Sequence, residues 1–305
     1  MSFSSPKASG APVRLNDNLR GALLMVGAMF GFALEDALIK TLAGTIPVGQ
    51  LLVIFGFLGG AMFAVMTWAQ GQRLWTQALL HPAVIIRNVG ELIGTVGFVT
   101  AIILTPLSTA SAILQATPLV VTLGAALFLQ EQVGWRRWAA IFVGFCGVLL
   151  IIRPGAESFD AKSLFAVQGV IGLATRDIAT RRVPKSITSL QLSTYAFFML
   201  IPAGALMLIF SEGMIRPDAV QWAVLLGSTV IGVAAYYMIV AAMRVGDVGY
   251  VTAFRYTRLI FALVIATTFF DERPDLLTLI GAAIIVTSGI YTLLREARLK
   301  RTSKP

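Results

Sequence analysis

Two stretches of the chain decide its fold because they resemble each other. The first reads Gly31-Phe-Ala-Leu-Glu-Asp-Ala-Leu-Ile-Lys40, and the second reads Gly172-Leu-Ala-Thr-Arg-Asp-Ile-Ala-Thr-Arg181. Their residue numbers differ by 141, and the same shift places Asp36 on Asp177, Gln50 on Gln191 and Glu131 on Glu272. A constant offset through polar positions indicates that one unit is present twice.

The composition is that of a membrane protein. Of the 305 residues, 57% are hydrophobic and 13% are charged, whereas an ordinary soluble domain has roughly a quarter of charged residues. A helix needs about 20 mostly apolar residues to cross the ~30 Å hydrocarbon core of a bilayer. Windows of that length predict ten transmembrane helices, near residues 19–39, 48–68, 83–103, 108–128, 135–152, 163–181, 189–210, 220–241, 246–269 and 276–294. An all-α membrane protein is favoured over a barrel, whose strands would be short and alternating.

Ten spans shared by two copies give five helices per copy. The predicted organisation is a disordered cytoplasmic tail, two repeats of five helices and a basic cytoplasmic tail, at residues 1–18, 19–152, 163–294 and 295–305. Because five is odd, the second copy enters the membrane from the opposite side, so the two repeats are inverted. Inverted repeats are a common basis of alternating access in transporters. A duplication that only enlarged a membrane protein is the alternative.

The chain has a net charge of +9, and its Lys and Arg residues are divided unevenly between the two sides of the membrane that the predicted spans define. Fifteen Lys and Arg residues fall on the side of the two termini, and five fall on the other side, namely Lys40, Arg153, Lys162, Arg216 and Arg273. Because cytoplasmic loops carry an excess of Lys and Arg, both termini are expected in the cytoplasm of a bacterium, with the protein in the inner membrane. The basic excess predicts this topology and no nucleic-acid partner.

Eight ionisable residues lie inside the predicted spans, where each costs several kcal/mol unless it is paired or hydrated. They are Glu35, Asp36, Arg87, Glu91, Arg176, Asp177, Arg255 and Arg258. Arg87 and Glu91 are four residues apart on one helical face, which predicts either a structural ion pair or a substrate contact. Arg255 and Arg258 share a face and have no acid on their own helix. We expect them to bind Glu35, Asp36, Glu91 or an anionic group of a substrate, because a guanidinium binds a carboxylate in bidentate fashion.

Other polar side chains are expected around these arginines. Ser111 and Gln115 belong to a polar stripe on the fourth span, Tyr256 is the counterpart of Gln115, and Tyr236 and Tyr237 are candidates to stack with Phe32. The predicted substrate-binding residues are Arg255, Arg258, Glu91, Arg87, Gln115, Ser111, Tyr256 and Tyr236. The predicted gating or ion-coupling residues are Asp36 and its counterpart Asp177, with Glu35 and Arg176 beside them. The structural alternatives are packing of the rings, bonding of the hydroxyls to their own helix, and snorkelling of the arginines to the membrane surface.

Several chemistries are excluded by what the sequence lacks. With one histidine, His81, and one cysteine, Cys146, a conventional transition-metal site is not expected, and no cofactor is expected either. The sequence has no P-loop and no Gly-x-Ser-x-Gly pattern. These absences argue against a chain that hydrolyses ATP and against an enzyme.

Four motifs carry a resemblance to a known family: residues 21–40, Pro106-Leu-Ser-Thr-Ala-Ser-Ala-Ile-Leu-Gln-Ala-Thr-Pro118, Glu131-Gln-Val-Gly-Trp135, and Gly144-Phe-Cys-Gly-Val148 followed by Arg153-Pro154-Gly155. With them the chain resembles the ten-helix EamA-type branch of the drug/metabolite transporter superfamily. The resemblance implies helices around a central cavity, a small-molecule substrate, and fifth and tenth helices outside the cavity that are available for a homodimer. The ninth span reads Thr252-Ala-Phe-Arg-Tyr-Thr-Arg-Leu259, where relatives have small or apolar residues, and this argues against a generic hydrophobic drug.

The sequence therefore predicts a membrane-embedded transporter that moves a small polar or amphipathic metabolite by alternating access. The arginines of the ninth span favour a substrate with an anionic group, such as an amino acid or a related compound. An uptake permease for a vitamin or nucleotide-like solute, and a passive channel, are the alternatives.

Overall fold

A computed structural model of the protein describes residues 15–130, 134–184, 186–211, 213–246 and 248–302. Within these ranges the chain is helical, and its helices are α1 (Leu15–Thr41), α2 (Val48–Ala69), η1 (Gln77–Leu80), α3 (Pro82–Leu104), α4 (Leu107–Leu114), α5 (Thr117–Phe128), α6 (Trp135–Ile152), η2 (Ala161–Ser163), α7 (Leu164–Thr180), α8 (Ser189–Ile209), α9 (Ala219–Val245), α10 (Val248–Thr252), η3 (Ala253–Tyr256), α11 (Thr257–Phe269) and α12 (Leu276–Thr302). The described part has no strand, as the sequence predicts.

The prediction of ten membrane spans is confirmed. Nine helical segments of the described chain are long and apolar enough to cross a membrane. The tenth is α7, which has 17 residues and carries Arg176 and Asp177 near its end. The protein is therefore a multi-pass membrane protein whose least apolar span is the first helix of the second repeat.

The predicted tails are shorter than expected. Helix α1 begins at Leu15, so residues 15–18 are helical and do not belong to a disordered tail. Helix α12 runs to Thr302 and takes in most of the basic segment predicted as a C-terminal tail. Residues 1–14 and 303–305 lie outside the described part, as does Glu131 of the repeat alignment.

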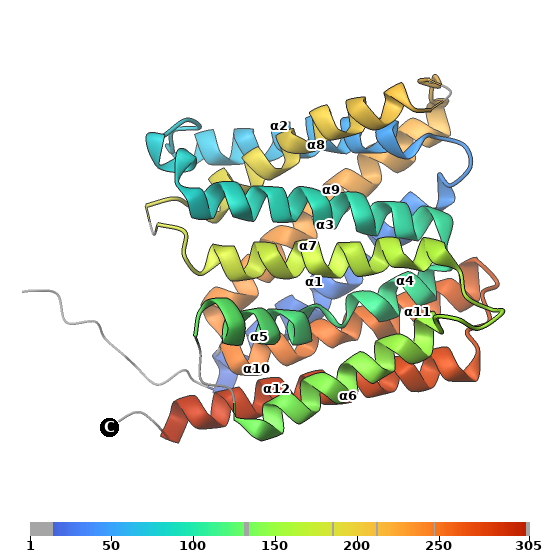
Figure 1. The fold of residues 1–305 in the computed structure, drawn as a ribbon. Helices are drawn as coiled ribbons and strands as arrows, with labels where there is room; N and C mark the ends of the chain where they lie inside the picture. Colours follow the sequence, from blue (N-terminus) through green and yellow to red (C-terminus); the bar gives the residue numbers. More distant parts are fainter. Residues whose placement is uncertain (1–14, 131–133, 185, 212, 247, 303–305) are drawn as a thin grey trace, which may run out of the picture.

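The helices pack in pairs that each take one member from each repeat (Figure 1). Helix α3 packs against α7, α2 against α8, α1 against α9, and α6 against α12. The α2–α8 pair and the α6–α12 pair lie at opposite edges of the bundle in Figure 1, with α3 and α7 between them. The charged residues of α1, α3, α7 and α11 are thus held inside a scaffold built jointly by the two repeats.

Two equivalent glutamines show how the inverted repeats are joined. Gln50 on α2 binds the α8–α9 connection, because its Nε2 donates to the Ile215 carbonyl at 2.6 Å and its Oε1 accepts from the Ile215 amide at 2.8 Å. Gln191 on α8 binds the α2–α3 connection, where its Nε2 donates to the Arg73 carbonyl at 2.7 Å. The two connections lie at opposite ends of the bundle, as inversion requires (Figure 1).

The fourth and ninth spans are both interrupted, at positions that the repeat alignment equates. The fourth span changes direction between α4 and α5, and the Thr117 hydroxyl donates to the Leu114 carbonyl at 2.6 Å there. The ninth span passes through the 3₁₀ turn η3, and the Thr257 hydroxyl donates to the Phe254 carbonyl at 2.7 Å. Interrupted helices are common at transporter binding sites, because they free backbone groups near the middle of the membrane. Here the second interruption holds Arg255.

At one end of the bundle, an acid of the second repeat binds the start of α4. The Glu272 carboxylate accepts bonds from the Leu107 amide at 2.6 Å, the Ser108 amide at 2.9 Å and the Ser108 hydroxyl at 2.7 Å. An acid at this place is favourable because the N-terminus of a helix carries unpaired amides and a partial positive charge. At the same end, Lys40 Nζ on α1 donates to the Thr105 carbonyl at the end of α3 at 2.5 Å.

Candidate functional site

An ion pair between the two repeats lies at the centre of the candidate site. Arg258 on α11 binds the Asp36 carboxylate on α1 through three bonds, at 3.1 Å from Nε to Oδ2 and at 2.9 and 2.7 Å from NH2 to the two oxygens. The Asp36 side chain is 4% exposed and that of Arg258 is 17% exposed. Of the partners expected for this arginine, the structure selects Asp36.

Two aromatic rings surround the Arg258 guanidinium. Its Cζ atom lies 5.2 Å from the ring centre of Phe32 on α1 and 5.2 Å from that of Phe98 on α3. Such cation–π contacts are worth about 0.5–2 kcal/mol, more where water is excluded. The rings and Asp36 together fix the guanidinium at the junction of α1, α3 and α11.

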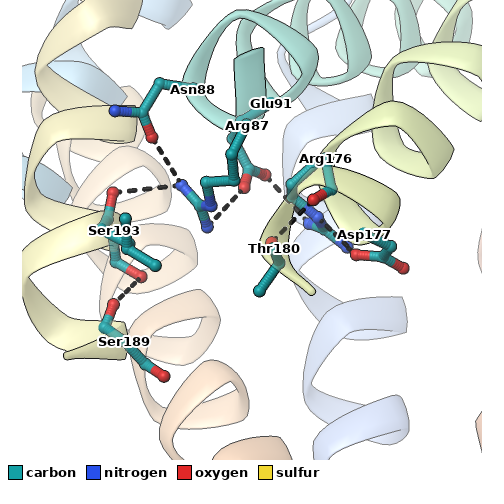
Figure 2. Close-up of polar contacts among 9 residues, drawn as sticks. Arg87, Asn88, Glu91, Arg176, Asp177, Thr180, Ser189 and Ser193 are labelled. Carbon is teal, nitrogen blue, oxygen red and sulfur yellow. Dashed lines mark hydrogen bonds and ion pairs between the residues drawn. The ribbon is translucent and has the colours of Figure 1, made fainter. Parts of the chain in front are cut away.

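A second charged network joins α3, α7 and α8 (Figure 2). Glu91 accepts from Arg87 on its own helix at 3.0 Å and from Arg176 on α7 at 3.0 Å. Arg176 also binds Asp177 at 2.8 Å. The Arg87 guanidinium donates to the Leu192 carbonyl on α8 at 3.1 Å. The predicted Arg87–Glu91 contact is therefore present, as one link of a longer chain.

The second network separates into an occluded and an accessible part. The Arg87 side chain is 5% exposed, whereas those of Glu91, Arg176 and Asp177 are 16%, 19% and 26% exposed. Arg176 reaches α3, where its guanidinium binds Glu91, and it also binds Asp177 on its own helix. The exposed fraction of the side chains therefore rises along the network from Arg87 to Asp177.

Two of the eight ionisable residues in the spans have no bonded partner among the described residues. Glu35 on α1 and Arg255 on η3 are both half-buried. Glu35 lies near Asp36 and Arg258, which are bonded to each other. Arg255 lies near Asp177, Arg176 and Arg258. The eight charges therefore divide into six that are paired and one unpaired charge of each sign.

A glycine makes room for Glu35. A Cβ atom at Gly232 on α9 would lie 2.6 Å from Glu35 Cδ and 2.7 Å from Oε2, which no real side chain allows. Gly232 is the repeat counterpart of Glu91, and Glu35 is the counterpart of Arg176. An ion pair in one half of the protein thus corresponds to an acid against a glycine in the other half.

The uncharged residues of the predicted site differ in burial and in the residues that they contact. Ser111 and Tyr256 are buried, and neither hydroxyl has a partner among the described residues. Gln115 is buried at the end of α4, at the interruption of the fourth span. Tyr236 packs edge-on against Phe63 with ring centres 5.2 Å apart, and not against Phe32. Tyr237 is 56% exposed, so the predicted stacking wall is wrong for this residue.

Two hollows are present in the described part of the structure. One has a volume of about 480 Å³ and is bounded by η3, α11 and α12, with Tyr256, Leu263 and Val286 in its wall. The other, also of about 480 Å³, lies between residues 44–48 and the α8–α9 connection. The first hollow is apolar, so its chemistry differs from that of the ionic cluster.

Sequence reasoning missed Phe98, Gly232, Asn88 and Glu272 as parts of this region. Asn88 accepts from the Arg87 guanidinium at 3.0 Å. Gly232 could have been predicted from the repeat alignment. It is the counterpart of Glu91, so a glycine stands in the second half where the first half has a charged residue, and Glu35 is the counterpart of Arg176, to which Glu91 is bonded. Phe98 carried none, since an apolar ring in an apolar span is indistinguishable from packing.

The family follows from this fold and from a direct match. Residues 19–153 and 162–294 each match the EamA-like transporter family. The chain therefore belongs to this family, in the drug/metabolite transporter superfamily.

Several curated relatives carry names that describe transport. An S-adenosylmethionine uptake transporter of Rickettsia conorii is 26% identical over 216 residues, which cover 70% of this chain and 72% of the relative. The pseudopaline exporter CntI of Pseudomonas aeruginosa is 26% identical over 273 residues, 88% of this chain and 94% of the relative. A riboflavin transporter of Vibrio cholerae is 25% identical over 277 residues, 91% and 85% of the two chains. These names support a small-metabolite transporter.

A solved crystal structure of another protein has the same fold. It has a TM-score of 0.61 and 21% sequence identity, and the match covers 94% of this chain and 99% of that chain. At this identity the likeness concerns the arrangement of helices alone.

Proposed function

We propose that this protein carries a small polar or amphipathic metabolite with an anionic group across a bacterial inner membrane by alternating access, with both termini in the cytoplasm. The observation that carries the proposal is the unpaired Arg255 at the interruption of the ninth span. A guanidinium remains charged at any physiological pH. Inside a membrane it needs an anion, and we propose that the transported solute supplies this anion.

The two repeats supply the means of alternation. Gln50 and Gln191 tie equivalent helices to the opposite repeat, and the Glu272 carboxylate closes one end against α4. Asp36 and Asp177 are equivalent acids, each near the C-terminal end of its own helix, and we propose that they and their neighbours Glu35 and Arg176 act at gates on opposite sides of the membrane. Exchange of shape between inverted halves then exposes the site to each side in turn.

The names of the relatives suggest the solutes to test first. They include S-adenosylmethionine, which has an amino-acid group, and riboflavin, which has neither a carboxylate nor an ammonium group. The charge of Arg255, which has no bonded partner among the described residues, favours the first kind of solute. The relatives include proteins named for uptake and for export, so flux is to be measured in both directions.

The test is solute flux in proteoliposomes with labelled S-adenosylmethionine and labelled riboflavin. We expect saturable flux that unlabelled solute competes away, and loss of flux in Arg255→Gln. Arg216→Gln, in an exposed connection far from the site, is the matched control and retains flux. Linear flux without saturation would indicate a channel, and unchanged flux in Arg255→Gln would remove anion binding from the proposal.

A further inference from the structure

The two repeats differ in the space between their last two spans. In the first half, α5 packs against α6. In the second half, α11 and α12 have little direct contact, and the apolar hollow of about 480 Å³ lies between them. The wall of this hollow comes from η3, α11 and α12. One repeat therefore closes a space that the other repeat leaves open.

An aliphatic side chain fills this space in the first half. Leu119 on α5 is fully buried and lies against Gly144 on α6, where a Cβ atom would overlap it. Its counterpart in the second half is Ile260, which is 61% exposed. With the one-residue adjustment that the last span requires, the counterpart of Gly144 is Val286 on α12. Because the valine side chain occupies the place that the glycine leaves free, Ile260 cannot lie against α12 as Leu119 lies against α6.

The hollow opens toward the hydrocarbon of the membrane. Both segments that bound it, Tyr250–Phe269 and Leu276–Arg295, are long and apolar enough to span a bilayer. Helix α12 lies at the edge of the bundle (Figure 1), and Ile260 and Leu279 at the rim of the hollow are exposed. Acyl chains surround a spanning helix over the ~30 Å hydrocarbon core. The molecules that meet this opening are therefore lipid chains and not water.

The wall of the hollow selects an apolar occupant. It consists mainly of aliphatic and aromatic side chains, and the Thr257 hydroxyl in it already donates to the Phe254 carbonyl at 2.7 Å. The Tyr256 ring reaches α12, where a Cβ atom at Gly289 would overlap its hydroxyl. This hydroxyl is buried and has no partner in the part of the chain that the structure describes. None of the described residues that line the hollow is charged, so contacts with carbon atoms must hold whatever binds there.

We propose that the hollow between α11 and α12 binds one acyl chain of a bilayer lipid, which takes the place that Leu119 takes in the first half. The hollow has the size of a small-molecule site, about 300–1,000 Å³, and a bound chain supplies the dispersion contacts that an open wall lacks. Because Phe254 and Tyr256 of the wall belong to η3, the chain also supports the interruption that carries Arg255. This inference does not depend on the proposed transport.

The test is photo-crosslinking of the purified full chain in nanodiscs whose phosphatidylethanolamine carries a diazirine in one acyl chain. Mass spectrometry locates the labelled residues, and we expect the labels to concentrate on Ile260, Leu263 and Val286. Leu226 and Val230 on α9 are exposed on another span and report ordinary contact with lipid. Equal labelling of the two sets of residues would mean that the hollow has ordinary lipid contact only, and would overturn the proposal.

Two substitutions on α12 add the same ring at different places. Ala283→Phe places the ring in the hollow and is expected to remove the labels from its wall. Thr287→Phe adds the ring one turn further along, outside the wall, and is the matched control that keeps the labels. Both positions are exposed, so neither ring has to enter the core. Ala283→Leu fills the hollow with a smaller side chain and is expected to reduce the labels. Labels that persist in both Ala283 variants would contradict the proposal.

Other occupants of the hollow give different results. Tyr256→Phe removes the hydroxyl and keeps the ring, so the labels are expected to remain, because an acyl chain does not need this hydroxyl. Loss of the labels in Tyr256→Phe would show that a polar group binds there, and the proposal would be wrong. For a second copy of the chain, the test is Ile260→Cys in a Cys146→Ser background. The expected result in native membranes is a monomer, and a disulfide-linked dimer would place a second copy over the opening and overturn the proposal.

Discussion

Gln50 in the first half and Gln191 in the second occupy equivalent positions and make equivalent bonds to the connections of the opposite half. Thr117 and Arg258 are also equivalent, yet they do different things. The Thr117 hydroxyl bonds to its own helix, whereas Arg258 crosses to Asp36 in the other repeat. The halves are alike where they hold the bundle together and unlike where they place charge inside it.

The likeness of the scaffold and the unlikeness of the charges indicate that the duplicated unit meets two separate requirements. Alternation between two shapes needs helices and connections that match, which the glutamines and the interrupted fourth and ninth spans provide. Recognition of a solute needs an asymmetric set of charges, because a small metabolite has no two-fold symmetry. Substitutions at equivalent positions can therefore separate the scaffold from the site.

The largest effect is expected for Arg258→Gln. It leaves the Asp36 carboxylate, which is 4% exposed, without a cation, and breaking a buried ion pair costs about 3–5 kcal/mol. Thermal unfolding of the purified protein in detergent measures the loss. The double variant Asp36→Asn with Arg258→Gln is expected to recover much of it, because no charge is left unpaired.

The counterpart Thr117→Val is the control for this comparison. It removes one hydroxyl bond within a helix and is expected to cost at most about 1 kcal/mol. An equal loss of stability in Thr117→Val and Arg258→Gln would mean that the ion pair between the repeats contributes nothing beyond an ordinary hydrogen bond.

The next largest loss of stability is expected for Gln50→Leu and Gln191→Leu. These variants test whether the two glutamines stabilise the two repeats equally. Both side chains are buried, and each substitution leaves a backbone carbonyl of the opposite repeat without its donor. Such a loss costs about 1–3 kcal/mol. The two variants are expected to lower the melting temperature by similar amounts, and a large difference between them would contradict their equivalence.

A smaller effect on stability, with a clear effect on solute flux, is expected for Gly232→Ala. The new Cβ atom displaces the Glu35 carboxylate from α9, but the end of this side chain is flexible and alanine favours the helix by about 0.5–1 kcal/mol. We expect a nearly unchanged melting temperature and slower solute flux in proteoliposomes, because Glu35 is one of the residues proposed to act at the gates. Gly227→Ala on the same helix is the control, since a Cβ atom there meets nothing within 4 Å.

The smallest effect concerns Asp275, which binds Arg153 and so ties the start of α12 to the end of α6. Bonds from the Arg153 and Thr278 side chains lower the pKa of Asp275 to about 2. Because the folded pKa is below the unfolded one, the stabilisation is complete above about pH 4 and is lost as the pH falls toward 2.

Asp275→Asn removes this pH dependence. Its melting temperature is expected to lie slightly below that of the natural protein at pH 5, and the two values converge toward pH 2. The side chain is 50% exposed, so screening by solvent keeps the difference small. A constant difference at all pH values would show that the carboxylate charge plays no part. The first half has no such tie, because its equivalent residue is Gly134.

Hydropathy and the repeat determine most of the fold without a structure. The ten windows match the helical segments closely, because a span must be apolar over about 20 residues and the chain between spans is short. The ends of α1 and α12 were less predictable, since polar residues extend a helix beyond the membrane without a hydropathy signal. Pro118 lies at the interruption of the fourth span, whereas the 3₁₀ turn of the ninth span contains no proline or glycine.

The sequence identified the charged residues of the site but not which of them form ion pairs with one another. The sequence marks eight charges that are out of place in a membrane, yet it offers Arg258 several acids in different helices. Only the packing of α1 against α11 brings Asp36 to it, 222 positions away. The sequence showed Glu272 only as the counterpart of Glu131. Its bonds to the N-terminus of α4 could not be predicted, because they depend on the packing of α4 against the chain that follows α11.

The pairing of helices between the repeats also bears on how the protein is made. Each of the main pairs, α1 with α9, α2 with α8, α3 with α7 and α6 with α12, joins an early part of the chain to a late one. When the ribosome has delivered the first five spans to the bilayer, none of these partners has been synthesised. Asp36 then lies in the bilayer without Arg258, while Glu91 has Arg87 on its own helix but not yet Arg176. We therefore expect the first half to depend on the insertion machinery until the second half arrives.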